Sequence, residues 1–447
     1  CIRDSLETIQ NIFKIEDLRV RILNTLGFLL IYRLGSYIVL PGVDSEALQI
    51  ANSGSGGGIA GLLDLFAGGA FSRASIFALG IMPYISASIV VQLLGIAIPY
   101  FQKLQKEGES GRRTINQITR FLTIAIVGFQ APGYIASQVP EFTGGGAMVR
   151  PDTFFWWFTT VVILITGTMF VMWLGERITE KGIGNGISLI IMIGIIANLP
   201  FAFVAEFASR LKDGGLVILL VEIVLLLIII VGTILLVQGT RRVPVQYAKR
   251  IVGNKQYGGV RQYLPLKVNA AGVMPIIFAQ AIMFIPITLV GFSDSDSLSG
   301  VAAALSDYTG FWYNFIFALM IIAFTYFYTA VTVNPNQMAD EMKKNGGFIP
   351  GVKPGKKTAE FLDNVLSRIT LPGSIFLALV AILPAFAGIF GVNAQFAQFF
   401  GGTSLLIMVG VILDTLQQIE SHLLMRHYDG LMKSGRIKGR SSINMAG

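Results

Sequence analysis

The chain has 447 residues, of which 53% are apolar and only 13% charged, and its mean hydropathy is +0.67. Soluble globular domains carry charges on about a quarter of their residues, so this composition excludes an ordinary soluble protein and predicts a membrane protein. The single cysteine, Cys1, excludes an internal disulfide and a cysteine-ligated metal site. His422 and His427 have no carboxylate cluster beside them, so we expect no bound metal and no cofactor.

Ten apolar segments are long enough to cross ~30 Å of hydrocarbon as helices of about 20 residues. They cover approximately residues 22–41, 74–98, 118–137, 153–174, 183–205, 215–238, 269–292, 311–333, 371–391 and 403–423. An all-α polytopic membrane protein is therefore expected, with two halves of five helices that allow an inverted internal repeat. The expected parts are an amphipathic segment over 1–21, a first half over 22–213, a second half over 214–425 and a tail over 426–447.

Basic residues gather on one side of these spans. All but five of the 34 lysines and arginines lie in the connections on the side of the N-terminus, the exceptions being Arg33, Arg73, Arg150, Arg210 and Lys212. Because such residues stay in the cytoplasm, both termini are expected there.

Two long cytoplasmic loops, 239–268 and 334–370, contain "RRVPVQYAKR", "GNKQYGG" and "GGFIPGVKPGKK". One interpretation is that these charges only set the orientation of the chain in the membrane. Their length and their Pro/Gly-rich turns favour a docking surface for a large partner, such as ribosomal RNA or an acidic protein.

Little in the spans indicates catalysis. Arg33, Glu222 and Asp414 have no partner one helical turn away, so structural pairing or snorkelling is expected of them. No P-loop, H-E-x-x-H or G-x-S-x-G motif is present, and we expect no enzyme. The glycine-rich "GIGNGIS" (182–188) follows "GERITEK" rather than a strand and lacks a Lys-Ser/Thr pair, which indicates a turn and helix start instead of a phosphate site.

Two features point to a channel. After a flexible Gly/Ser stretch over 53–58, "IAGLLDLFAGGAF" (59–71) is too short to span and too apolar for water, so it is expected to fold back into the protein. Ile81 and Ile85, like Ile187 and Ile191, are one helical turn apart and share a helix face. If these faces converge, they form an apolar collar that excludes water when shut.

Seven stretches, in order along nearly the whole chain, resemble the bacterial SecY family, which forms the channel of the general protein-secretion translocon. They are "GGAFSRASIFALGIMPYISASIVVQLL" (68–94), "KEGESGRR" (106–113), "GTMFVMWLGERITEKGIGNGISLI" (167–190), "RRVPVQYAKR" (241–250), "LPLKVNAAGVMPIIFA" (264–279), "FIPGVKPG" (348–355) and "GGTSLLIMVGVILD" (401–414).

The resemblance implies a ten-helix channel in the bacterial inner membrane, hinged at its outer side, that passes unfolded preproteins and opens sideways between the second and seventh spans. The implied pore ring is Ile81, Ile85, Ile187, Ile191, Ile277 and Ile407. The implied plug is the 59–71 segment, with Leu62, Leu63, Asp64, Leu65 and Phe66. Polar positions of the implied lateral gate are Ser86, Gln130 and Asn269.

The implied partners are SecE, SecG, the SecA ATPase, the ribosome, signal peptides, preproteins and lipid. The expected docking residues are Arg241, Arg242, Lys249, Arg250, Lys353, Lys356 and Lys357. Two departures from the family pattern concern this surface. "IVGNKQYGGVRQ" lacks the paired arginines frequent at that loop tip, and Lys353 stands where an arginine is usual, which keeps the charge but loses the bidentate fork.

Two other functions compete with a channel. A secondary transporter of a small solute would also fit ten spans, but it needs a polar site at the membrane midplane. A receptor that docks ribosomes without conducting would explain the basic loops and leave the re-entrant segment without a role.

Overall fold

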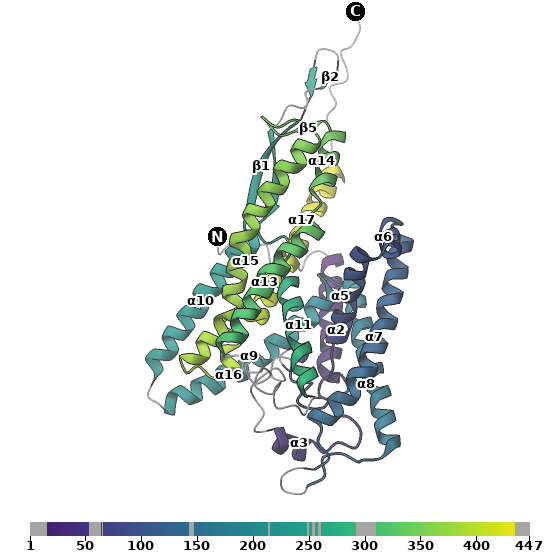
Figure 1. Ribbon diagram of the computed structural model, residues 1–447, viewed down its shortest axis with the longest axis vertical. Helices are drawn as coiled ribbons and strands as arrows, with labels where there is room; N and C mark the ends of the chain where they lie inside the picture. Colours follow the sequence, from purple (N-terminus) through teal and green to yellow (C-terminus); the bar gives the residue numbers. More distant parts are fainter. Residues whose placement is uncertain are drawn as a thin grey trace, which may run out of the picture.

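The computed structural model describes residues 16–52, 64, 66–142, 147–212, 215–247, 250–252, 255–257, 261–291 and 310–433. Long helices lie side by side in two groups, and a small sheet projects from one end (Figure 1). The helices are α2 (Glu16–Gly35), α3 (Ser45–Asn52), α5 (Met82–Ala97), α6 (Pro99–Lys106), α7 (Glu109–Gln138), α8 (Phe154–Lys181), α9 (Gly186–Lys212), α10 (Leu216–Gln238), α11 (Met274–Gly291), α13 (Phe311–Thr332), α14 (Pro335–Lys344), α15 (Lys356–Ile389), α16 (Ala394–Ala397) and α17 (Gly402–Lys433). The strands are β1 (Thr240–Tyr247), β2 (Arg250–Val252), β3 (Lys255–Tyr257), β4 (Arg261–Lys267) and β5 (Gly347–Phe348).

Each of the ten expected spans overlaps a helix of this structure. Within the described residues, seven helices are long and apolar enough to cross a membrane, or eight if the bent pair of α5 and α6 is one span. The helices α2 and α11 lie where the first and seventh spans are expected but outside this set. In α2 the reason is charge, because Arg19, Arg21 and Arg33 leave only a short uncharged stretch between them. The fold class is therefore confirmed as helical and polytopic, without the count of ten.

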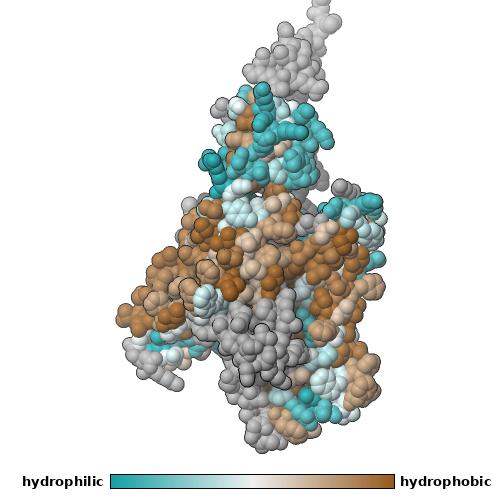
Figure 2. All heavy atoms as spheres, in the orientation of Figure 1, coloured by the Kyte–Doolittle hydropathy of each residue, from teal (hydrophilic) through white to brown (hydrophobic). Residues whose placement is uncertain are grey.

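An apolar band covers the middle of the molecule (Figure 2). Polar residues gather beyond this band, over the strands and α14 at one end. The most apolar helix, α10, exposes much of its surface, including Val217, Leu220 and Leu235. Exposed apolar side chains in a continuous band are what a lipid bilayer requires of the surface that it contacts.

The 239–268 loop contains strands of a small β-sheet, which were not predicted from the sequence within this helical fold. β1 pairs antiparallel with β4, from Thr240 opposite Lys267 to Gln246 opposite Arg261. β5 pairs with the other edge of β1. Val243 and Val245 are buried where β1 covers α14 and the start of α15, and together with Leu362 they form a separate small core.

The second span begins later than expected. Residues 68–81 form successive turns, and α5 begins at Met82. Gly68, Gly69 and Gly80 have positive φ angles in this stretch, and so does Ala74. Left-handed backbone is incompatible with helix continuation, so the apolar sequence "IFAL" (76–79) forms turns, and its Phe77 ring stacks on Tyr32 of α2 and Phe170 of α8.

The ninth span begins earlier than expected. α15 is continuous from Lys356, within the expected 334–370 loop, and retains Pro372 and Pro384 in its interior. Its first turns lie outside the apolar stretch, since "KKTAEFLDNVLSR" is amphipathic. Hydropathy places the start of the span at residue 371, whereas the helix itself begins at Lys356 and packs against the sheet through Leu362 and Leu366.

Candidate functional site

The six isoleucines expected to form the ring lie in one apolar cluster. Four are buried in it, namely Ile81, Ile85, Ile191 and Ile407, and none of these four exposes more than 9% of its surface. Ile187 and Ile277 are partly buried and pack against the same cluster. The structure thus brings together side chains from α5, α9, α11 and α17, four helices that are far apart in the sequence.

Helix starts bring these side chains together. Each of the six residues lies in the first two turns of its helix or, for Ile81, directly before it. α5 and α17 run in the opposite sense to α9 and α11 under the expected topology, so helices starting from both sides meet at this cluster. A collar made only of branched apolar side chains offers no hydrogen bonds and excludes water when closed.

The glycine-rich turn before α9 fixes the position of Ile187 and Ile191. The Asn185 side chain accepts hydrogen bonds from the backbone N–H of Ile187, at 3.1 Å, and of Ser188. The Gly186 N–H donates to the hydroxyl of Thr179 at 2.9 Å, and a Cβ on Gly186 would overlap the Gly175 carbonyl oxygen. The turn is therefore a helix start that permits close packing of α8 and α9, as predicted for "GIGNGIS".

Of the five residues expected in the plug, Leu62, Leu63 and Leu65 lie outside the described residues. Phe66 is buried in the same cluster as the isoleucines. Asp64 closes a compact turn, because its carbonyl accepts from the Gly69 N–H and its Oδ1 accepts from the Ser72 N–H, both at 2.9 Å. The described end of the segment thus lies directly against the isoleucine cluster.

The three polar positions expected at the lateral gate are not joined to one another by any hydrogen bond in the described structure. Ser86 donates to the Met82 carbonyl of its own helix at 3.2 Å. Gln130 is exposed on α7. Asn269, in the turn before α11, is buried, and its Oδ1 has no partner among the described groups.

The basic loops meet in one surface, which the sequence did not indicate. Arg241 and Arg242 are exposed on β1, and pairing of Tyr247 with Gly347 brings the second loop beside them. Lys353, Lys356 and Lys357 are exposed after β5, and the Lys357 ammonium lies 2.8 Å from Glu360. Lys249 lies outside the described residues, and Arg250 is placed only as backbone of β2.

An ionic group at the far end of α9 was also missed. Arg210 Nε lies 2.8 Å from Glu206, one turn earlier on α9, and Arg210 Nη2 lies 2.6 Å from Glu222 on α10. Arg210 also donates to the Gly391 carbonyl, and Glu206 accepts from the Asn393 N–H. Glu222 therefore has a partner on another helix, where a search one turn along its own helix could not find it. The i, i+4 pair within α9 was the available signal.

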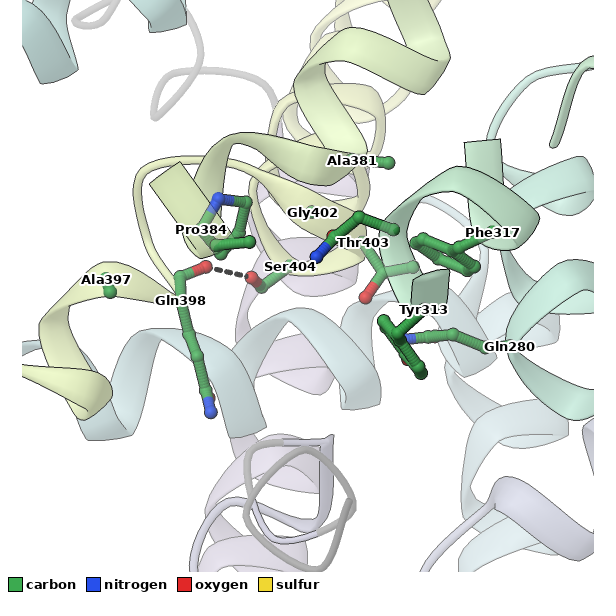
Figure 3. A pocket seen from close by; sticks show the side chains of 12 residues that line it. Gln280, Tyr313, Phe317, Ala381, Pro384, Ala397, Gln398, Gly402, Thr403 and Ser404 are labelled. Atoms are coloured by element: carbon green, nitrogen blue, oxygen red, sulfur yellow. Dashed lines mark hydrogen bonds between the residues drawn. The ribbon is translucent and has the colours of Figure 1, made fainter. Parts of the chain in front are cut away.

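A pocket lies behind two of the isoleucines, between α11, α13, α15 and α17 (Figure 3). Gln280 and Thr403 line it, each about one helical turn from Ile277 or Ile407, and Ser404 donates to the Gln398 carbonyl at 2.7 Å. Its volume of about 50 Å³ holds a few water molecules. Sites for small solutes are typically several hundred Å³, so this pocket does not supply the midplane site that a transporter needs.

The family model of SecY matches residues 75–416 of this chain. The chain is 45% identical over 437 residues to the protein translocase subunit SecY of Mycobacterium bovis, and this alignment covers 93% of the chain and 97% of that relative. It is 44% identical over 437 residues to the same subunit of Streptomyces coelicolor, covering 94% of this chain and 98% of the relative.

Three solved structures share the fold. A protein-conducting channel superimposes with a TM-score of 0.59 at 18% identity, over 90% of this chain and 92% of that one. A second structure is a SecY channel, with a TM-score of 0.59 at 17% identity over 90% of this chain and 92% of that one. Its plug domain is described as stabilising the closed state and maintaining a membrane seal. Sec61 in the canine ribosome–channel complex gives 0.55 at 17%, again over 90% and 92%. With relatives of this identity aligned along nearly its whole length, the chain belongs to the SecY family of protein translocase subunits.

Proposed function

We propose that this chain is a protein-conducting channel, which passes unfolded preproteins across the plasma membrane and releases membrane-protein segments sideways into the lipid. The observation that carries the proposal is that six isoleucines from four helices lie in one apolar cluster, four of them buried in it and two partly buried and packed against it. Such a collar tolerates any side chain that passes, because it makes no specific polar contact, and it closes by excluding water. The energy for transport then comes from a bound partner, and the chain itself catalyses no reaction.

In the proposed closed state, the isoleucine cluster and Phe66 form one continuous apolar barrier across the pore. The 59–71 segment acts as the plug, and α5 and α11 act as the two sides of the lateral gate, with Ser86, Gln130 and Asn269 as its polar positions. Asn269 supports this role, because a buried amide oxygen without a partner lowers the free-energy cost of opening a seam there.

The joined basic loops support a cytoplasmic docking surface for the ribosome and the SecA motor, with SecE and SecG as further subunits. Under this proposal both termini and the sheet lie in the cytoplasm. Arg241, Arg242 and Lys353 are exposed on this surface. Sec61 in the canine complex, which shares the fold, is bound to a ribosome.

Crosslinking tests the pathway directly. In a Cys1→Ser background, Ile191→Cys or Ile407→Cys is introduced, and a preprotein with one cysteine is stalled during translocation in proteoliposomes. We expect a disulfide-linked product at both positions, because a chain in the pore must touch the collar. Leu227→Cys is the matched control, since this residue of α10 is 56% exposed on the apolar band. Export without crosslinks at 191 and 407, or equal crosslinking at 227, would refute the pathway.

A further inference from the structure

We infer that Arg33 and Arg73 are positioning residues that hold the plug closed through one shared carbonyl group, an inference that rests on the proposed channel function. Arg33 Nη1 and Arg73 Nη2 each donate a hydrogen bond of 3.0 Å to the carbonyl oxygen of Gly68. Arg33 is on α2, and Arg73 follows the plug segment in the turns before α5. Two cationic groups from different elements therefore bind a single backbone atom of the plug.

The carbonyl they bind is held against α9. Gly68 is buried with φ +66°, and a Cβ there would lie 2.6 Å from Arg33 Nη1 and 2.9 Å from the Cα of Gly194. Gly194 is one helical turn beyond Ile191 on α9, so the bound carbonyl is next to the isoleucine cluster. A shift of the plug away from the cluster must therefore separate Gly68 from both guanidinium groups.

These arginines are available for this purpose. Among the described residues neither guanidinium group belongs to an ion pair, and both lie over the Tyr37 ring, at 5.4 Å and 4.3 Å from its centroid. A charged donor strengthens a hydrogen bond to a neutral carbonyl, whereas two like charges on one acceptor repel each other. The charge of the donors therefore strengthens the two hydrogen bonds to the Gly68 carbonyl. The repulsion between the two guanidinium groups favours their separation once that carbonyl moves away.

Ion conductance of the purified complex in planar bilayers, without any preprotein, measures the effect. Arg33→Gln and Arg73→Gln should each raise the resting open probability by roughly tenfold, the equivalent of one charge-assisted hydrogen bond. Arg33→Lys should restore most of the closure, since an ammonium group keeps the charge and one donor. The thermal unfolding temperature should stay at the parent value, which a merely structural role would not allow.

Arg150→Gln is the matched control. It removes the same charge from the same side of the membrane, and Arg150 Nε also donates to a backbone carbonyl, that of Val139, at 2.6 Å. The Val139 carbonyl is outside the plug, so the resting conductance of Arg150→Gln should equal that of the parent. Equal leakage from Arg150→Gln would show that Arg33 and Arg73 act through net charge and would overturn the inference.

Gly194→Ala provides a second route that leaves both arginines intact. The added Cβ would lie 2.7 Å from the Phe66 carbonyl oxygen and push the plug segment off α9, so this variant should leak as well. Ile407→Asn reports on the channel itself. If Ile407→Asn leaks while Arg33→Gln, Arg73→Gln and Gly194→Ala stay closed, the role of the two arginines is refuted and the channel proposal stands. If Ile407→Asn also stays closed, both proposals fail.

Discussion

Ile407 shows at the scale of one residue what the closed state of the proposed channel requires. Its side chain is 4% exposed and lies in a cluster built from branched aliphatic and aromatic groups. Branched side chains are stiff about χ1, so a collar of isoleucines keeps its shape without a bound substrate. A polar group placed there is buried without a hydrogen-bond partner, which costs about 1–3 kcal/mol in proteins.

Ile407→Asn should therefore weaken the closed state relative to the open one. We expect a reporter preprotein with a crippled signal peptide to be exported about 5- to 150-fold more than in the parent, the range given by 1–3 kcal/mol. Ile412→Asn on the same helix is the control, because Ile412 is 41% exposed, whereas Ile407 is buried. No gain from Ile407→Asn, or an equal gain from Ile412→Asn, would contradict the ring assignment.

The sequence reveals single residues only where a local pattern marks them. Ile81 with Ile85, and Ile187 with Ile191, are visible as pairs one turn apart. Ile277 and Ile407 have no such pair, and only the family resemblance singled them out. The sequence shows Arg33 as a charge in a span, but its partner is a backbone carbonyl 35 residues away, and no side-chain motif encodes such an acceptor.

At the scale of elements, a buried ionic group joins α9, α10 and the turn before α16. Glu206 is 1% exposed and Glu222 is 6% exposed, and Arg210 lies between them. One guanidinium group thus neutralises one of two buried carboxylates and bridges both. Buried charges that lose their partner are strongly destabilising, by about 3–5 kcal/mol, whereas a neutral hydrogen-bonding replacement costs far less.

The two ends of this group should therefore respond unequally to the loss of charge. Arg210→Gln leaves two carboxylates buried side by side and should lower the unfolding temperature of the detergent-solubilised complex by several degrees. Glu222→Gln keeps an acceptor for Arg210 and leaves a neutral Glu206–Arg210 pair, so its unfolding temperature should stay close to the parent value. Equal losses from the two variants would show that the charge balance is not what stabilises this junction.

The strands β1 and β5 were not predicted, because average hydropathy does not distinguish a short strand from a polar loop. "RRVPVQY" has buried Val243 and Val245 two residues apart, which is a strand pattern, but two arginines and a proline made the stretch resemble a loop. β5 has only two residues and exists because β1 is beside it. Its pairing depends on a contact between residues about 100 positions apart, which hydropathy cannot report.

At the scale of the whole molecule, polar contacts at both ends of α9 join residues of the expected first half to residues of the expected second half. Near its start, the Gly184 N–H donates to the side chain of Gln418 on α17 at 2.8 Å. Near its end, Arg210 binds Glu222 and the Gly391 carbonyl. Because these contacts fasten one edge of the molecule at two levels, we expect the halves to pivot about α9 and to separate at the opposite edge, where the lateral gate is proposed.

The sheet of β4, β1 and β5 adds a surface that neither loop provides alone. β1 carries Arg241 and Arg242, and β5 joins the loop with Lys353 to the same sheet. If ribosomal RNA is the partner, each basic residue that contacts a phosphate releases a bound counterion, and affinity falls steeply as salt rises. The number of such contacts can therefore be read from the salt dependence of binding.

Replacing both Arg241 and Arg242 by Gln should weaken ribosome binding to the complex in nanodiscs, and should make the slope of log affinity against log salt shallower by about two, one for each lost phosphate contact. Arg113→Gln is a control in the other half, because Arg113 is 79% exposed and pairs with Glu109 at 2.9 Å. A lower affinity with an unchanged slope would mean that the arginines contact protein instead of RNA. An unchanged affinity would remove β1 from the docking surface and leave the basic residues of the sheet with a role in topology alone.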